Sequence, residues 1–344
     1  MVVVHETSPS RVLLGSGARH AVPEELTRLG ADRVLVVATR SAGTTADELV
    51  AALGERAVAR FDGAVVHTPV EVTEQALSAV ADAEADAVVT IGGGSAVGLG
   101  KALVARTGLP HLTMPTTYAG SEVTPVLGET KDGVKQTRRD PALLPGTVVY
   151  DVDLTLTMPV GLTLTSAVNA LAHAVEALWA ATSTPVSDAL ATESARLLLG
   201  ALPPVLDDPT SPAGREALQQ GAWLAGTCLA TVPMGLHHQL AHALGGTFDL
   251  PHAPLHTLLL AHVVRHNLPF APAAADRLTA ITGGDPAAAI ATLAASYDGP
   301  RRLRDLGVPD DGLAAVANRV AAAPYPNPGP VDAPAVLALL RAAW

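Results

Sequence analysis

The sequence predicts two domains, an α/β domain built on a parallel sheet followed by an all-helical domain. In the first half, short β-branched runs alternate with Ala-rich helical patterns, as repeated βαβ units require. The strand signal disappears after Pro159, where long Ala/Leu helical patterns take over. The length of 344 residues is about twice that of a typical domain. We therefore expect an α/β domain at residues 1–155 and a helical domain at residues 156–344.

The elements of the first half follow from local hydrophobic patterns. Apolar, β-branched runs predict buried strands, and amphipathic Ala-rich stretches predict the helices between them. The predicted strands are Arg33–Thr39, Gly63–His67, Ala87–Ile91, a short run before Met114, and Thr147–Tyr150. The predicted helices are Thr45–Leu53, Val72–Ala83 and one that follows the glycine run beginning at Gly92.

The second half predicts helices separated by turns that contain proline and glycine. These helices are Thr165–Ala180, Ser187–Leu199, Arg215–Ala230 and Leu236–Ala243. The tail Pro324–Pro330 is too rich in proline to be helical, and we expect a last helix that ends at Trp344.

Composition excludes several classes of protein. Hydrophobic residues make up 49% of the chain and charged residues 16%, which favours a large buried core over disorder. The net charge of -11 argues against a nucleic-acid partner. The single cysteine, Cys228, excludes an internal disulfide. Met1–His5 is too short for a signal segment, and no run approaches the roughly 20 apolar residues of a membrane span, so we expect a cytoplasmic protein.

A glycine run stands where a nucleotide would bind. Gly93, Gly94 and Ser95 follow a predicted strand and open a helix, whose free N–H groups favour a pyrophosphate. The run follows about the third strand, whereas the usual dinucleotide fingerprint follows the first. Thr39 and Arg40 end the first strong strand, which leaves the choice between NAD and NADP open. The alternative interpretation is a tight turn that packs a helix on the sheet.

A hydroxyl-rich loop at residues 114–124 follows the next predicted strand. Such a loop at the carboxyl edge of a parallel sheet donates hydrogen bonds to sugar and phosphate oxygens. The candidate residues are Thr116, Thr117, Ser121 and Thr124. Ordinary turn chemistry is the alternative interpretation.

Histidines are concentrated in one segment. Of the 12 histidines, seven lie between residues 237 and 266, namely His237, His238, His242, His252, His256, His262 and His266. His238 and His242 share a helix face, and His252 begins the next predicted helix. We expect two facing helices to bring these three histidines to one cleft with His173, which lies one turn after Asn169. Any single histidine of this segment could be structural, but we interpret the cluster as an active site. We interpret His237, His262 and His266 as structural.

Together, these motifs resemble the iron-containing (group III) alcohol dehydrogenases. The shared motifs are Gly92-Gly-Gly-Ser95, Pro115-Thr-Thr117, Gly120-Ser-Glu122, Asn169-x-x-x-His173, His238-x-x-x-His242 and Pro251-His252. Longer stretches are similar to the maleylacetate reductase branch, namely Pro115–Glu122, Asp132–Lys135, Arg139–Pro141, Leu236–His238 and Gly245–Ala253. The resemblance covers nearly the whole chain. It implies a Rossmann-like first domain, a dehydroquinate synthase-like fold, a nicotinamide cofactor and a homodimer.

The resemblance also bears on metal binding. In metal-dependent members an Asp and three His hold the cation, and the matching positions here are Asn169, His173, His238 and His252. A neutral amide in place of the carboxylate lowers the affinity for a divalent cation. We therefore expect no catalytic metal, and we interpret the four positions as a vestigial site.

The implied reaction is the NADH-dependent reduction of maleylacetate to 3-oxoadipate, with NADPH as the alternative cofactor. Maleylacetate is a dicarboxylate in which an alkene is conjugated to a ketone. Hydride addition to the conjugated C=C needs hydrogen-bond donors and a proton, which histidines supply. We expect His242 to be the acid and His173, His238 and His252 to bind the substrate's oxygens. By resemblance Lys135 reaches the cofactor, and Lys135, Arg138 or Arg139 meets a carboxylate.

Three departures from the reductase pattern leave other functions open. Gly329 replaces a possible carboxylate-binding Arg, Pro254 replaces Glu, and Leu260-Ala-His262 replaces Leu-Pro-His with a new Arg265 nearby. One alternative is a biosynthetic paralogue with another substrate, or with a non-redox lyase or cyclase reaction. The other is a metal-dependent alcohol dehydrogenase in which Asn169 serves as a poor ligand.

Overall fold

The computed structural model describes His5 and residues 10–344. The apolar residues 1–4, weighed above as a signal segment, lie outside this description. Contacts group the described residues into two compact units. Unit 1 contains His5 and residues 159–209 and 220–344, and unit 2 contains residues 10–158 and 210–219.

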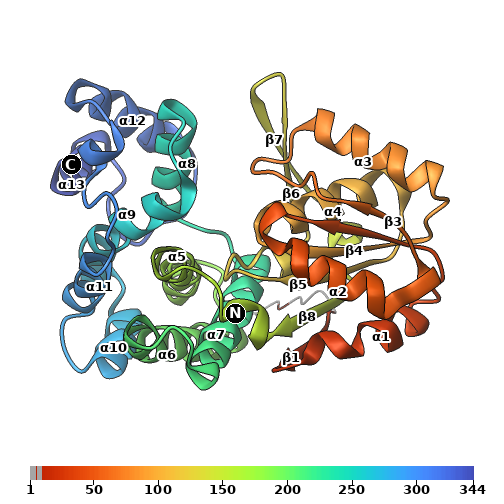
Figure 1. Cartoon of the computed structure of the whole chain (residues 1–344). Helices are drawn as coiled ribbons and strands as arrows, with labels where there is room; N and C mark the ends of the chain where they lie inside the picture. Colours follow the sequence, from red (N-terminus) through yellow and green to blue (C-terminus); the bar gives the residue numbers. More distant parts are fainter. Residues whose placement is uncertain (1–4, 6–9) are drawn as a thin grey trace. The chain divides into compact units, whose positions relative to one another are not determined.

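Unit 2 is built on a parallel six-stranded sheet, as predicted (Figure 1). In spatial order the strands are β1 (Arg11–Gly15), β8 (Thr147–Asp151), β5 (His111–Pro115), β4 (Ala87–Gly92), β2 (Val34–Ala38) and β3 (Ala57–Phe61). The helices are α1 (Val22–Arg28), α2 (Gly43–Leu53), α3 (Val70–Asp82) and α4 (Gly94–Thr107). A separate antiparallel hairpin consists of β6 (Val126–Lys131) and β7 (Val134–Arg139).

Both faces of this sheet are covered by helices. Along β2, Val34 and Val36 pack with side chains of α1 and α2, whereas Leu35 and Val37 pack with side chains of α3 and α4. Strands buried on both faces are apolar throughout, with no alternation between apolar and polar residues. The continuous apolar runs therefore revealed β2 and β4 in the sequence.

The predicted strand Gly63–His67 is wrong. The edge strand is β3, whose residues are all half-buried, and Gly63–His67 belongs to the loop that leads to α3. Val65 and Val66 are 44% and 68% exposed, so their β-branched side chains do not report burial in a sheet. His67 and Thr68 have φ values of 66° and 44°, in the left-handed region that strands do not use. Strand β1 and the β6–β7 hairpin were also missed.

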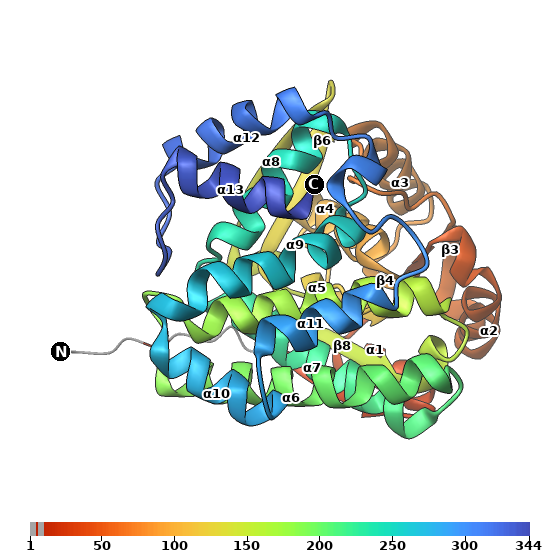
Figure 2. The same cartoon turned by 90° about the vertical axis from the view of Figure 1, so that its left-hand side faces the viewer.

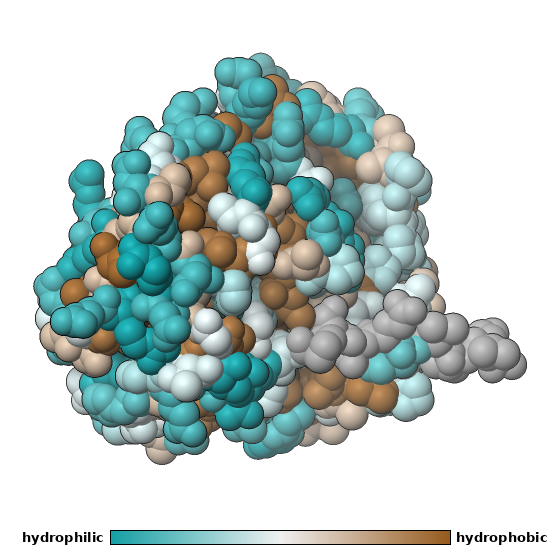
Figure 3. All heavy atoms as spheres, turned by 90° about the vertical axis from the view of Figure 1, so that its right-hand side faces the viewer, coloured by the Kyte–Doolittle hydropathy of each residue, from teal (hydrophilic) through white to brown (hydrophobic). Residues whose placement is uncertain are grey.

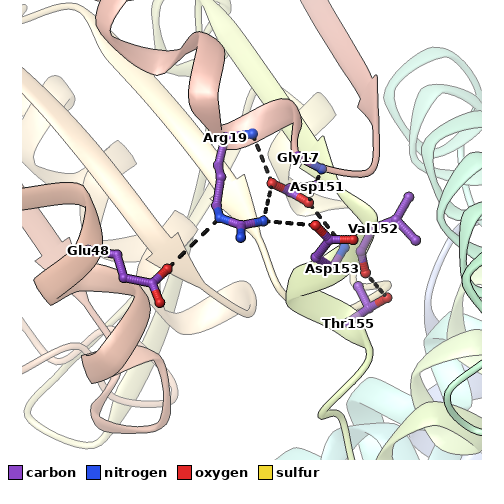
Figure 4. A network of polar contacts seen from close by, with 7 residues as sticks. All are labelled: Gly17, Arg19, Glu48, Asp151, Val152, Asp153 and Thr155. Atoms are coloured by element: carbon purple, nitrogen blue, oxygen red, sulfur yellow. Dashed lines mark hydrogen bonds and ion pairs between the residues drawn. The ribbon is translucent and has the colours of Figure 1, made fainter. Parts of the chain in front are cut away.

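A buried carboxylate ties the ends of β1 and β8 together (Figure 4). Asp151 accepts hydrogen bonds from the backbone N–H groups of Gly17 (3.0 Å) and Arg19 (2.9 Å), and from Arg19 Nη1 (2.8 Å). Arg19 Nη1 also lies 3.1 Å from Asp153. Gly17 has a φ of 72°, which glycine adopts at little cost. The turn after β1 is therefore fixed by charge-assisted hydrogen bonds at the carboxyl edge of the sheet.

Unit 1 is helical over its described residues, as predicted (Figure 2). Its helices are α5 (Val160–Leu178), α6 (Pro185–Asp207), α8 (Leu236–Phe248), α9 (His252–Asn267), α10 (Pro272–Thr282), α11 (Pro286–Ala295), α12 (Asp310–Ala322) and α13 (Ala333–Ala343). Helix α7 (Pro212–Thr231) belongs to unit 1 from Gln220 onward. Helix α5 is almost wholly buried and packs against α6 and α9.

Two details of unit 1 concern proline. Helix α6 continues beyond the predicted end at Leu199, through Pro203 and Pro204, to Asp207. The tail Pro324–Pro330 is not helical, as expected, and α13 follows it.

The described helices include none that is long and apolar enough to cross a membrane. On the face drawn in Figure 3, hydrophilic residues cover much of the surface, and apolar residues are interspersed among them.

The stability of the sheet should depend on pH through His111. This histidine is buried on β5, and its Nε2 lies 2.9 Å from the hydroxyl of Thr90, which donates in turn to Thr113. Burial, followed by the charge of Lys101, lowers the pKa of His111 to about 3, from 6.5 when exposed. The unfolded chain therefore binds a proton that the folded chain rejects, so stability is lost as pH falls from 6.5 toward 3.

We expect His111→Gln to remove this dependence, because a glutamine amide donates to Thr90 without titrating. The free energy of unfolding in urea, measured from pH 7.5 to pH 4 for both proteins, checks this. The wild type should lose its advantage over the variant below pH 6.5. A constant difference across this range would contradict a neutral, buried His111.

Candidate active site

The glycine run lies at the point in the sheet where the strand order reverses. From β2 the chain proceeds to β3 on one side, and then to β4 on the other side. The loops after β2 and β4 therefore leave the sheet side by side, at the crevice where ligands of this architecture bind. A Cβ added at Gly92 would lie 2.8 Å from the side chain of Thr39, which follows β2. Thr39 and the glycine run, both named above as cofactor-binding candidates, are thus in contact.

The loop after β5 covers the same glycines. The N–H of Thr116 donates to the carbonyl of Gly92 (3.0 Å), and a Cβ on Gly93 would lie 3.0 Å from Thr117. At Gly94, where α4 begins, an added Cβ would meet only Ala119, at 3.6 Å. The predicted residues Thr39, Gly93, Gly94, Ser95, Thr116 and Thr117 therefore gather around the N-terminus of α4. This position suits a phosphate.

Ser121 and Thr124 have a structural role that the sequence did not reveal. Lys101 of α4 is buried, and its Nζ donates to the carbonyls of Ser121 (2.5 Å), Thr124 (2.7 Å) and Val126 (2.8 Å). The hydroxyl of Thr124 donates to the carbonyl of Ser121 (3.0 Å). Burial lowers the pKa of Lys101 to about 7, against the opposing charge of Glu122. A lysine within an apolar helix face is the signal that could have revealed it.

A second buried cation holds the same loop. Arg215, at the start of α7, is fully buried and donates to the hydroxyl of Tyr118 (3.4 Å) and to the carbonyl of Met158 (3.1 Å). Because Tyr118 lies between Thr117 and Ser121, this contact fixes the middle of the hydroxyl-rich loop.

The predicted cations near residue 135 lie on the β6–β7 hairpin, where all of β7 is exposed. Lys135 pairs with Thr130, and Arg139 pairs with Val126, which places both cations on one face of the hairpin. Arg138 lies on the opposite face, which includes the buried Leu127, and forms an ion pair with Asp140 at 2.6 Å. The structure therefore groups Lys135 with Arg139 and separates Arg138 from them.

The histidines of unit 1 form one cluster from three helices. Helix α5 carries Asn169 and His173, α8 carries His237, His238 and His242, and α9 carries His252 and His256. Ring centroids are 4.8 Å apart for His173–His238, 6.3 Å for His238–His242, 5.6 Å for His242–His252 and 4.4 Å for His252–His256. The four predicted histidines are therefore brought together.

Two further histidines belong to the same cluster. His237, interpreted above as merely structural, has its Nε2 2.7 Å from His256 Nδ1, and His256 Nε2 lies 3.0 Å from His252 Nε2. His266 lies elsewhere, with its Nε2 2.8 Å from the carbonyl of Pro330. His262 is partly buried on α9. Spacing would have revealed His256, because it lies one turn after His252.

Electrostatics keep the interior of this cluster neutral. Burial, followed by the charges of neighbouring histidines, lowers the pKa values of His173, His237 and His256 well below 6.5. His242 and His252 are exposed. The cluster therefore runs from a neutral, buried interior to an accessible edge.

Several polar atoms in the interior of the histidine cluster have no hydrogen-bond partner among the described residues. Asn169 Oδ1, His173 Nδ1 and His238 Nε2 are buried and make no hydrogen bond to any described residue. Buried polar atoms are nearly always paired, with protein, water or a ligand. These atoms could hold the oxygens of a small polar molecule.

Comparison with known proteins places the chain in a family. Residues 9–152 match the model for iron-containing alcohol dehydrogenase, and residues 163–344 match the C-terminal model of the Fe-containing alcohol dehydrogenase family. The chain belongs to the iron-containing alcohol dehydrogenase family. The family inferred from the sequence motifs is thereby confirmed.

Similar members of the family are maleylacetate reductases. The enzyme of Sphingobium indicum is 45% identical over 344 residues, which is 100% of this chain and 97% of the relative. Maleylacetate reductase 1 of Rhodococcus opacus is 46% identical over 338 residues, or 98% and 95% of the two chains. The protein in the crystal structure of maleylacetate reductase from Agrobacterium tumefaciens is 44% identical in sequence, with a TM-score of 0.96. The match covers 100% of this chain and 98% of that protein.

The backbone geometry at Gly92 leads to a prediction about stability. Gly92 has a φ of 146° and contacts Thr39, so Gly92→Ala adds both backbone strain and a clash. We expect a loss of about 1–3 kcal/mol in the free energy of unfolding. Gly94→Ala is the matched control, because its new methyl group meets only Ala119 at 3.6 Å, and it should cost less than about 0.5 kcal/mol. Equal losses in urea denaturation would contradict the geometry of this loop.

Proposed function

We propose that the protein is a maleylacetate reductase that reduces the conjugated C=C of maleylacetate to give 3-oxoadipate, with NADH and without a catalytic metal. The observation that carries the proposal is the histidine cluster with Asn169 in it, where His173 is kept neutral by burial and buried atoms of Asn169, His173 and His238 make no hydrogen bond to a described residue. The relatives that are 45% and 46% identical over nearly the whole chain support the substrate.

We assign the cofactor to the α/β domain, residues 1–155. Gly93, Gly94 and Ser95 would contact the pyrophosphate at the N-terminus of α4. Thr39, Thr116 and Thr117 would contact the sugars. Ser121 and Thr124 shape the loop. The neighbouring glycines leave the backbone open to such an approach. The bound nicotinamide supplies the hydride. NADPH is the second cofactor to test, because Arg40 beside Thr39 could meet its additional phosphate.

Three features support a reaction that does not use a metal. The four positions that hold the cation in metal-dependent relatives are here Asn169, His173, His238 and His252, a set with no carboxylate. The rings of His173 and His238 are stacked, with an interplanar angle of 23°. His252 Nε2 is directed at His256 Nε2, at 3.0 Å. These features make the set a poor one for a divalent cation, and no step of the proposed reaction passes through one.

The helical domain, residues 156–344, would then supply the donors and the proton. Hydride addition to the alkene carbon farther from the ketone moves an electron pair onto the ketone oxygen and forms an enolate. His173, His238 and His252 would hold the substrate's oxygens. His242 would donate the proton to the carbon beside the ketone, since it is exposed at the accessible edge of the cluster. Lys135 and Arg139 are the cations that we assign to a carboxylate of the substrate or to the cofactor.

One observation favours a related substrate as the second candidate. A Cβ added at Gly329 would lie 2.8 Å from Asn267 Oδ1 and 3.1 Å from the ring of His266. Asn327 closes this corner by donating to Asn267 Oδ1 (2.8 Å) and to the carbonyl of Gly329 (3.0 Å). As packed here, the corner would have to rearrange around Asn267 and His266 to accept an arginine. A paralogue that reduces a different enone is therefore the alternative to maleylacetate itself.

The proposal includes a cytoplasmic homodimer, by analogy with the family. Light scattering on the purified protein tests the oligomeric state.

The proposal is tested by NADH consumption with maleylacetate, measured before and after exhaustive chelation. We expect equal, rapid turnover in both samples, with one 3-oxoadipate formed for each NADH consumed. Activity that is lost on chelation and restored by iron or zinc would indicate a metal-dependent alcohol dehydrogenase. The absence of turnover with any enone or ketone would favour a lyase or cyclase reaction on this scaffold.

A further inference from the structure

Glu176 is a buried carboxylate that no motif indicated. It lies on α5, one turn after His173, and is 1% exposed. Its Oε2 accepts hydrogen bonds from the N–H of Gly235 (3.1 Å) and from His238 Nδ1 (2.6 Å). Its Oε1 accepts from the N–H of His237 (2.8 Å). Three donors therefore converge on one carboxylate beside the histidine cluster.

The carboxylate stands at the N-terminus of α8. This helix has no side-chain cap of its own, and Glu176 takes that role from another helix. A Cβ added at Gly235 would lie 3.2 Å from Glu176 Oε1, so the approach of the backbone to the carboxylate needs a residue without a side chain. An anion is favoured here because the first N–H groups of a helix carry partial positive charge.

The same contact determines which nitrogen of His238 faces the cluster. A carboxylate only accepts hydrogen bonds, so the proton at the 2.6 Å contact lies on His238 Nδ1. His238 Nε2 then points away from Glu176, and it is one of the buried atoms that make no hydrogen bond to a described residue. The ring also stacks on His173, with centroids 4.8 Å apart, so its plane is held from a second direction.

We propose that Glu176 is the positioning residue of the active site, which holds His238 with Nδ1 as donor and Nε2 presented to the substrate. The inference rests on the proposed function, in which His238 binds a substrate oxygen. Glu176 touches neither substrate nor cofactor, and acts only through the orientation in which it holds the ring of His238. Removing the outer partner of a metal-bound histidine typically costs about 10–100-fold in activity, and we expect a loss of the same order here.

The direct test is nitrogen NMR on protein labelled with 15N-histidine, with His238→Asn used to assign the signal. In the wild type we expect a proton on His238 Nδ1. In Glu176→Gln the amide N–H₂ must face either the N–H of His237 or the position shared by Gly235 N–H and His238 Nδ1, so the hydrogen bond to Nδ1 should weaken and its nitrogen signal should shift. An unprotonated Nδ1 in the wild type would overturn the proposal. This result does not depend on turnover, so it separates a wrong position from a wrong substrate.

Kinetics provide the second readout. Glu176→Gln should lower kcat for maleylacetate about 10–100-fold, with an unchanged Kd for NADH, because the cofactor residues lie in unit 2. Glu176→Asp keeps the carboxylate and should recover part of the loss. Glu193→Gln is the matched control, because among the described residues Glu193 pairs with the exposed Arg196 on α6 and should not change kcat. A Glu176→Gln protein with a lower Tm but an unchanged kcat would reduce Glu176 to a helix cap.

Discussion

Six imidazoles packed into one cluster cannot all take up a second proton and become charged, and this constraint shapes the rest of unit 1. Burial and mutual repulsion keep His173, His237 and His256 neutral, so the rings must share protons with one another. The contacts from His237 through His256 to His252 do so. Among the described residues, Glu176 is the carboxylate that contacts these rings. Its oxygens already accept hydrogen bonds from the N-terminus of α8 and from His238. The cluster therefore offers hydrogen-bonding groups without a free carboxylate, which suit an enolate better than they suit a cation.

A different constraint applies to the α/β unit. The loops that we assign to the cofactor must keep the N-terminus of α4 accessible. Parallel strands bring the loops after β2, β4 and β5 to one edge of the sheet. Buried Lys101 and Arg215 then hold the hydroxyl-rich loop through its carbonyls and Tyr118. Burial costs each side chain its hydration, and protein acceptors replace the water around both.

The sequence predicted the parts of the fold whose patterns are local. Strands β2 and β4 are continuous apolar runs, and the helices of unit 1 are long stretches rich in Ala and Leu. Strand β3 was misplaced because a half-buried edge strand carries less apolar signal than the exposed Val65 and Val66. In the site, the histidines and glycines were visible by spacing. Glu176 and Lys101 were not, because their roles depend on partners that are distant in sequence and meet only in the folded chain.

The central claim is that hydride goes to the conjugated alkene and not to a carbonyl. The most direct measurement locates the deuterium that is transferred from deuterated NADH, by NMR of the product. The account predicts that deuterium lies on the former alkene carbon farther from the ketone, with a solvent proton on its neighbour. Deuterium on a carbinol carbon would show that a carbonyl is reduced, and it would contradict the role assigned to the neutral histidine cluster.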